Sequence, residues 1–244
     1  MIHIWHEDSN DSVTQKFWEF LREQKVLGHL GRVEIRAFEH NYELVNHLVS
    51  CSFTDTDTYF IFLDYVLDND MIVEYIDTIL SVQALHSNLI FVPLLCFEYL
   101  LLRSPLIVDW LTCTKLNIGF NRALEARQAF LAYMSGQSDK KLLETDTLAS
   151  YLCTCYNLSD KKELKGKFIT TETVATLILH NLTNSLPTDF VVTKTKWGSC
   201  WTCNCCRYRN RQGLCSLYTK LLNSQQKAKD LYTRTDAKLY LEGK

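Results

Sequence analysis

The sequence predicts an α/β protein in which a mostly parallel sheet is flanked by helices and is followed by a helical half. Short apolar segments typical of strands alternate with segments of helical periodicity over roughly the first hundred residues. Beyond about residue 104, nearly all periodic segments have helical spacing. The 244 residues, of which 47% are hydrophobic and 22% charged, have the composition of a compact globular protein.

Each element is expected from the spacing of its apolar residues. The segment 59–64 (YFIFLD) is a nearly continuous apolar run, which is typical of a buried parallel strand, whereas 32–38 (RVEIRAF) alternates between apolar and polar residues. In chain order, the elements expected in the first half are a strand at 2–6, a helix at 12–24, a strand at 32–38, a helix at 41–50, a strand at 59–64, a helix at 71–80, a strand at 88–95 and a helical region from 96–102.

The second half is expected to be helical and to end in a small separate element. Segments 122–134 and 171–182 have helical spacing, 159–168 is a charged loop, and 189–194 is a further strand candidate. This organisation predicts three regions, which are an α/β domain at 1–110, a helical region at 111–193, and a basic, cysteine-rich element with a C-terminal helix at 194–244.

The formal net charge of −2 hides a strong asymmetry. Residues 194–244 carry eleven basic and three acidic residues, whereas the rest of the chain carries 15 basic and 25 acidic ones. The basic tail could contact phosphates, or its charges could form a solvated surface or bind the acidic body. The first residues lack the pattern of a signal peptide, and prolines and charges interrupt the longest apolar run, so we expect a cytoplasmic protein without a membrane span.

Acidic residues follow two of the predicted strands. Glu7 follows the first strand, Asp64 ends the third, and Asp68 and Asp70 lie in the loop after it. Because ligands of open α/β sheets bind outside the carboxyl ends of the strands, we expect these carboxylates at one edge. Magnesium is held by one or two carboxylates together with water and phosphate oxygens, so this pattern predicts a metal site for phosphoryl transfer.

The alternative interpretation of these loops is helix capping. Asp11 or Ser12 could cap the first helix, and Asn69 or Asp70 could cap the third.

The arrangement of acidic residues on alternating strands and helices resembles the Toprim domain of topoisomerases, primases and several nucleases. The stretch IFVPLLCFEYLLLRSP is similar to a region of RloB-type proteins, a Toprim-related group from restriction and phage-defence loci, in which a Phe-Glu pair starts a Leu-rich helix. The resemblance covers about residues 1–110.

The resemblance implies an activity and a role for each of five carboxylates. Glu7 would be the general acid or base, while Asp64 and Asp68, together with Asp70, would hold one or two magnesium or manganese ions. Glu98, from the Phe-Glu pair, would be a further ligand, a partner of a ligand, or a buried structural glutamate. The implied activity is that of a metal-dependent nuclease acting on DNA or RNA in defence against phage or mobile elements, where such enzymes often work with a partner protein.

The chain departs from the Toprim pattern at two positions. No glycine follows Glu7, and Val66 stands where a second aspartate is expected after Asp64. These departures favour an alternative, in which the protein is a non-catalytic Toprim-like module that recognises nucleic acid or a partner protein through its basic tail.

The segment 197–215 contains half of the ten cysteines, namely Cys200, Cys203, Cys205, Cys206 and Cys215. Four thiolates with CxxC spacing bind zinc tetrahedrally and leave no open position for a substrate, so we predict a structural zinc site. We expect Cys200, Cys206 and Cys215 to bind the ion, with Cys203 or Cys205 as the fourth ligand. A redox pair and reduced buried cysteines without metal are the alternatives.

Basic residues alternate with Trp197, Trp201 and Tyr208 around this cluster. Cations suit phosphates and aromatic rings suit bases, so this composition predicts contact with nucleic acid. The alternative is that the rings form a small core around the zinc site. The predicted nucleic-acid-binding residues are Lys194, Lys196, Arg207, Arg209 and Arg211.

Overall fold

A four-stranded, fully parallel sheet forms the first half of the chain in the computed structural model. Its strands are β1 (Ile2–His6), β2 (Val33–Ala37), β3 (Thr58–Phe62) and β4 (Leu89–Val92), and their spatial order is β2-β1-β3-β4. The structure describes residues 1–10, 12–23, 25–103, 118–137 and 141–183, together with Tyr232, Lys238, Leu241 and Glu242.

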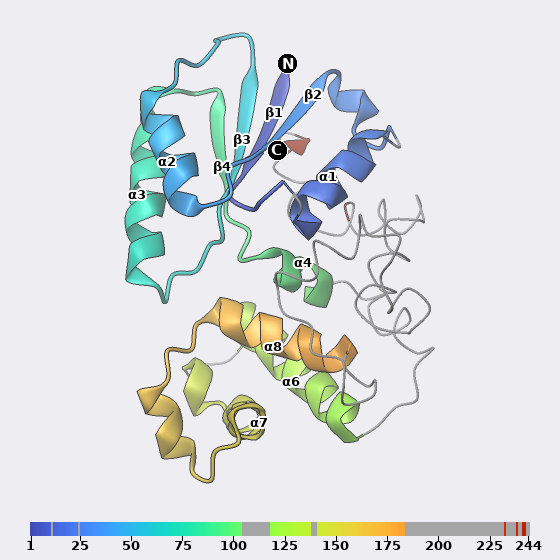
Figure 1. The fold of residues 1–244 in the computed structure, drawn as a ribbon, viewed down its shortest axis with the longest axis vertical. Helices are drawn as coiled ribbons and strands as arrows, with labels where there is room; N and C mark the ends of the chain where they lie inside the picture. Colours follow the sequence, from blue (N-terminus) through green and yellow to red (C-terminus); the bar gives the residue numbers. More distant parts are fainter. Residues whose placement is uncertain are drawn as a thin grey trace.

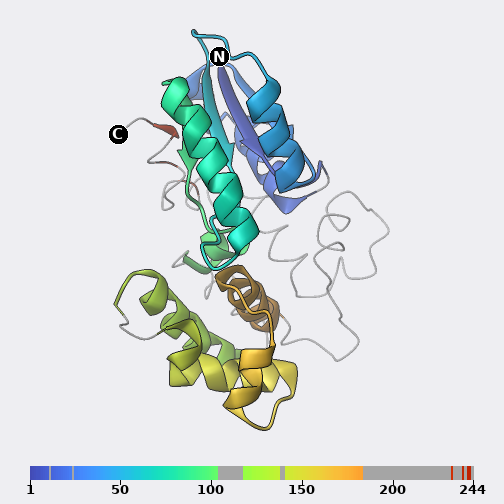
Figure 2. The same ribbon diagram turned by 90° about the vertical axis from the view of Figure 1, so that its left-hand side faces the viewer.

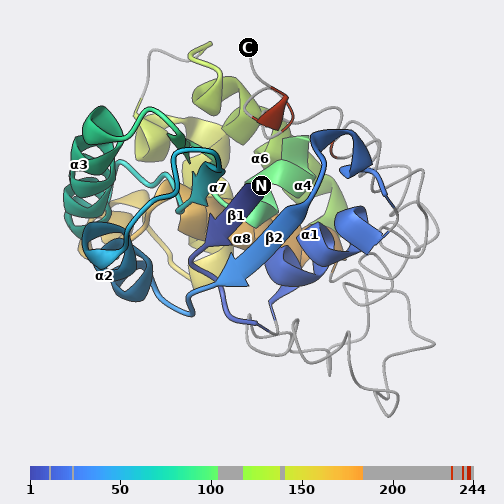
Figure 3. The ribbon, with the colours of Figure 1, turned by 90° about the horizontal axis from the view of Figure 1, so that it is seen from above.

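Helices cover both faces of this sheet. Helix α1 (Val13–Glu23) lies on one face, and α2 (Asn41–Ser50) and α3 (Asp70–Leu85) lie side by side on the other, as Figure 3 shows from above. A short 3-10 helix, η1 (Gly28–Leu30), leads from α1 towards β2. This three-layered arrangement confirms the predicted α/β fold with a parallel sheet.

The second half is helical where it is described, as predicted. Helix α4 (Phe97–Arg103) follows β4 at the carboxyl end of the sheet, and α8 (Thr171–Thr183) contacts both α4 and α6 (Ile118–Met134) (Figures 1 and 2). The remaining helical elements are η2 (Leu142–Glu144), α7 (Asp146–Tyr156) and η3 (Lys161–Gly166). None of the helices in the described part of the chain is both long and apolar enough to cross a membrane.

Aromatic side chains fill the layer between the sheet and α2. Trp5 of β1 lies at the centre of this group, with its ring centroid 5.6 Å from that of Phe38, 5.0 Å from that of His47 and 5.1 Å from that of Tyr59. Edge-on and tilted aromatic pairs at these distances contribute about 0.5–1.5 kcal/mol each beyond their buried area. This cluster fixes α2 on the sheet.

The opposite face of the sheet packs against α1. Trp18 of α1, which is only 2% exposed, lies 5.0 Å from the ring of Phe62 in β3. His6 turns towards the same helix, because its Nε2 atom is 2.7 Å from Oε1 of Gln15. Trp5 and His6 therefore point to opposite faces, as the alternation along a strand requires.

Most predicted elements agree with the structure to within a few residues, and the differences have local causes. Strand β4 ends at Val92 because Pro93 has no N–H for the ladder. The charged segment 159–168 contains η3 rather than an irregular loop, and the Asp160 carboxylate accepts a hydrogen bond of 2.8 Å from the N–H of Lys162 at its start. The strand candidate at 189–194 lies outside the described residues.

Asp68 joins the sheet to the helical half. The backbone N–H of Thr171, the first residue of α8, donates to Oδ2 of Asp68 at 2.8 Å, and the Thr171 hydroxyl donates to Oδ1 at 3.2 Å. The first N–H groups of a helix have no partner within the helix, so this carboxylate supplies one from a loop 103 residues earlier. Thr170 provides a second cap, because its hydroxyl oxygen accepts from the N–H of Thr173.

Replacing Asp68 should therefore weaken the folded state. We expect Asp68→Ala to lower the free energy of unfolding by about 0.5–2 kcal/mol, because the N–H of Thr171 at the start of α8 loses its capping acceptor. Asp68→Asn should lose less, since the amide keeps one acceptor oxygen. Urea denaturation measures the difference, with Asp77→Ala on the exposed side of α3 as the control. An Asp68→Ala protein as stable as the control would contradict this role.

Candidate functional site

Glu7 and Asp64 meet at the carboxyl edge of the sheet. β1 and β3 are neighbours, and their registered residues end with His6 opposite Phe62. The backbone N–H of Asp64 donates to Oε1 of Glu7 at 3.1 Å. The chain continues from β1 into α1 on one face and from β3 into α3 on the other, which makes the β1–β3 edge a topological switch point.

Backbone hydrogen bonds hold the loops that follow β3 and β4 against each other. The N–H of Val66 donates to the carbonyl of Asp64 at 2.9 Å, and that of Leu94 donates to the carbonyl of Val92 at 2.8 Å, so each loop makes a tight three-residue turn. The N–H of Tyr65 then donates to the carbonyl of Leu94 at 3.0 Å and connects the two turns. Asp64 is therefore presented by a fixed backbone.

Asp64 and two further carboxylates, those of Glu98 and Glu172, act electrostatically on the thiol of Cys96. Cys96 is 1% exposed, and its Sγ accepts a hydrogen bond from the N–H of Tyr99. Burial raises the pKa of this thiol well above its ordinary value, and the negative charges of Glu98, Asp64 and Glu172 raise it further. Carboxylates from the loop after β3, from α4 and from α8 thus all raise the pKa of one buried thiol.

Glu172 is the member of this group that sequence reasoning missed. It lies in the first turn of α8, where an acidic residue is common because it complements the helix dipole. That position alone gave no sign of a site. Its place near the sheet follows from the contact of Asp68 with Thr171, which joins segments 103 residues apart.

The other predicted carboxylates have different surroundings. Asp68 is engaged by Thr171 through both oxygens, as described above. Asp70 is the exposed first residue of α3, directly after the N-cap residue Asn69. Glu98 is buried in the first turn of α4. The capping alternative holds for the first helix, where the hydroxyl of Ser12 accepts from the N–H of Gln15 at 3.0 Å.

The geometry of the described residues allows a metal site with one or two protein ligands, but not a site in which their side chains supply most of the ligands. Within the described ranges, no three His, Cys, Asp or Glu side chains lie close enough to bind one ion together. Magnesium commonly takes only one or two carboxylates and keeps several waters. Glu7 and Asp64 fit this smaller requirement, because both are half-buried carboxylates that could act as metal ligands. They are also neighbours, since the backbone N–H of Asp64 donates to the Glu7 carboxylate.

His6 extends the site beneath Glu7. Its Nε2 faces Oε1 of Gln15, whose amide Nε2 donates to Oε1 of Glu19 at 2.8 Å, so the chain of hydrogen bonds makes Nε2 of His6 the donor. Nδ1 of His6 is buried, and no atom of the described residues forms a hydrogen bond with it. Burial lowers the pKa of His6, against the opposing charges of Asp8 and Glu19. The ring is therefore a neutral support under the edge.

The predicted zinc and nucleic-acid sites lie outside the described residues, since none of Cys200, Cys203, Cys205, Cys206, Cys215, Lys194, Lys196, Arg207, Arg209 and Arg211 belongs to them. Comparison of the chain with protein families, curated proteins and solved structures gave no match.

The buried neutral His6 should make stability depend on pH. The unfolded chain gains a proton on this imidazole below its ordinary pKa of 6.5, whereas the folded protein does not until a lower pH. Stability should therefore fall as the pH falls from 7 to 5, by up to about 2 kcal/mol from this group. His6→Gln, which can still donate to Gln15, should reduce that loss in urea denaturation at each pH.

The exposed His40 provides a matched control for this experiment, and His40→Gln should leave the pH dependence as in the wild type. A His6→Gln protein whose stability falls as steeply as that of the control would show that His6 titrates as it does in the unfolded chain.

Proposed function

We propose that the protein is a divalent-cation-dependent phosphodiesterase that cleaves nucleic acid at the carboxyl edge of the β1–β3 pair. The observation that carries this proposal is the contact between Glu7 and Asp64 at the switch point of the sheet, where open α/β proteins bind their ligands. The parallel sheet is compatible with the Toprim resemblance of residues 1–110, from which the proposed role in defence against phage or mobile elements is taken.

The carboxylates have different roles in the proposed reaction. Asp64 would hold the cation, and the charges of Glu98 and Glu172 would favour a cation at this edge. Magnesium or manganese, when bound, supplies positive charge to a phosphate. Glu7 accepts a proton from the attacking water as the new oxygen–phosphorus bond forms, and returns a proton to the leaving oxygen. The hydrogen bond from Asp64 to Glu7 orients this carboxylate.

Asp68 has a positioning role in this proposal. Its oxygens hold the start of α8, so Asp68 keeps the neighbouring Glu172 beside the edge. The tail residues 194–244 would supply the binding surface for nucleic acid, with a zinc ion as a structural staple.

A second candidate function is a non-catalytic module that binds nucleic acid or a partner protein. Two observations favour it. Asp68 is engaged in helix capping, and no three side chains of the described part form a metal cage.

Cleavage assays separate the two candidates. We expect the wild-type protein to cut single-stranded or double-stranded DNA or RNA with magnesium or manganese, and Glu7→Gln and Asp64→Asn to lose activity by about 100-fold or more. Glu7→Gln is suited to this test because its amide oxygen can still accept from Asp64, so the fold should be kept. Asp77→Asn on the outer side of α3 should remain fully active.

Binding of manganese, followed by calorimetry, gives a readout that does not require turnover. Asp64→Asn should weaken it and Asp77→Asn should not. A wild-type protein without cleavage activity, or variants as active as the wild type, would leave the binding module as the function.

A further inference from the structure

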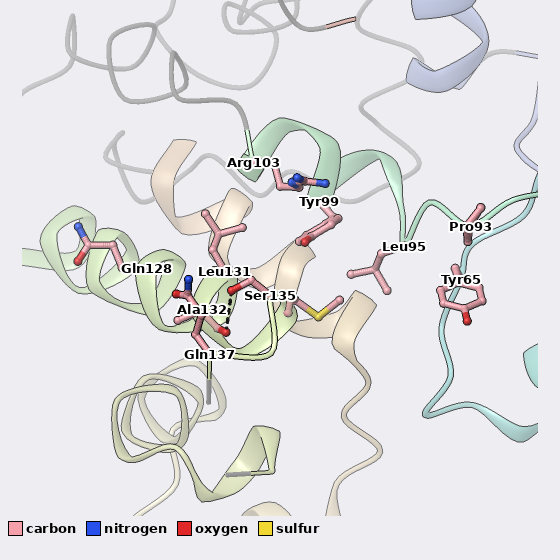
Figure 4. Close-up of a pocket in the computed structure, with 11 residues that line it drawn as sticks. Tyr65, Pro93, Leu95, Tyr99, Arg103, Gln128, Leu131, Ala132, Ser135 and Gln137 are labelled. Carbon is pink, nitrogen blue, oxygen red and sulfur yellow. Dashed lines mark hydrogen bonds between the residues drawn. The ribbon is translucent and has the colours of Figure 1, made fainter. Parts of the chain in front are cut away.

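A cavity of about 630 Å³ lies between the loops at the carboxyl end of the sheet and the helical half. It is bounded by the loops after β3 and β4 and by helices α4 and α6 (Figure 4). Its volume is typical of sites that bind drug-sized ligands. The polar and aromatic residues that line it are Tyr65, Tyr99, Arg103, Gln128, Ser135 and Gln137.

The cavity is adjacent to the proposed catalytic residues along the chain. Tyr65 directly follows Asp64, and Tyr99 directly follows Glu98. The tight turns after β3 and β4 that hold Asp64 also hold the backbone of Tyr65. The backbone that presents Asp64 therefore also positions one wall of the cavity.

Two properties of this cavity indicate which ligand it could bind, and the first is a flat apolar surface. The ring of Tyr99 points from α4 into the space in front of α6 (Figure 4), and it packs edge-on against Phe130 of α6, with ring centroids 6.0 Å apart and an interplanar angle of 85°. Leu95 and Leu131 add aliphatic surface. Aromatic rings held in this way are suited to stacking with a flat ligand such as a nucleobase.

Positive charge at the wall is the second property. Among the described residues that line the cavity, Arg103 is the charged one, and its Cζ lies over the Tyr99 ring, 5.9 Å from the ring centroid. Nε of Arg127 donates to the carbonyl of Leu102 at 2.8 Å, which connects the last turn of α4, and with it Arg103, to α6. A guanidinium group binds phosphate oxygens through two parallel donors.

We propose that this cavity binds one unpaired nucleotide unit, with its base stacked on Tyr99 and its phosphate at Arg103. The side-chain amides of Gln128 and Gln137 offer donors and acceptors for the edge of the base. In its relation to cleavage the inference rests on the proposed function, since the bound nucleotide would lie next to the scissile bond. A duplex cannot supply such a unit without unpairing a base.

Fluorescence anisotropy with the full chain tests the proposal. The probe is a labelled single strand of about eight nucleotides, a length within the range bound by single-strand-binding folds, and EDTA is present so that no cleavage occurs. We expect Tyr99→Ala to weaken binding about 5- to 150-fold, the range that loss of one stacked base produces. Arg103→Ala should weaken it about 10- to 150-fold, the range for loss of hydrogen bonds to a charged group. Tyr99→Phe, which keeps the aromatic ring, should bind as the wild type does.

Matched controls lie away from the cavity. Tyr42 on α2 is 58% exposed and Arg32 precedes β2 at the opposite edge of the sheet, so Tyr42→Ala and Arg32→Ala should leave affinity unchanged. Arg103 is exposed, so its replacement tests the cavity even where Tyr99→Ala fails to fold. Affinities of Tyr99→Ala or Arg103→Ala equal to those of the controls would overturn the proposal, as would a duplex that competes as well as the single strand.

Two further experiments identify the source of the nucleotide and distinguish the nucleotide-binding cavity from the proposed nuclease function. Displacement of the probe by a free mononucleotide would assign the cavity to the small molecule, whereas displacement by unlabelled strand alone would assign it to nucleic acid. Glu7→Gln should bind the probe normally without cutting it. If binding depends on Tyr99 and Arg103 but the protein never cleaves, the nucleotide-binding cavity is supported and the nuclease function is rejected. If cleavage is unchanged by both substitutions, the nuclease function is supported and the nucleotide-binding cavity is rejected.

Discussion

The parallel pairing of β1 with β3 is the constraint on which the rest of the structure depends. Their register ends with His6 opposite Phe62, so the residues that follow both strands are forced to the same edge. A slip of one residue would turn Trp5 and His6 to the wrong faces, because successive side chains of a strand alternate. The aromatic cluster of Trp5 on one side and the hydrogen bond of His6 to Gln15 on the other oppose such a slip, and this preserves the contact of Glu7 with Asp64.

The helical half completes this edge rather than standing apart from it. Asp68 accepts two hydrogen bonds from Thr171, which places the first turn of α8, and with it Glu172, beside the loop after β3. Arg127 of α6 similarly holds the last turn of α4. The set of carboxylates that includes Asp64 and Glu172, and the cavity, therefore both contain residues from the two halves of the chain.

The spacing of apolar residues predicted most of the strands and helices, because each element buries one face and its apolar residues recur with the period of that element. α2, for example, has the predicted bounds, and its buried Leu44, Val45 and Leu48 have helical spacing. The meeting of Glu7 with Asp64 was also predictable, since it follows from parallel strands. The hydrogen bonds of Asp68 with Thr171 were not predictable, because local pattern does not show that the start of α8 lies next to the loop after β3.

The charges around Cys96 limit the chemistry that this edge can perform. A nucleophilic cysteine must be a thiolate, whereas burial and three nearby carboxylates hold the pKa of Cys96 well above its ordinary value. The sulfur is therefore better described as a small apolar group in the core than as a nucleophile. The same negative charges repel a phosphodiester, so a nucleic acid could approach only with positive groups beside it. Arg103 in the cavity wall supplies one such group, and the tail, with eleven basic and three acidic residues, has the net positive charge that could offset the net negative charge of the rest of the chain.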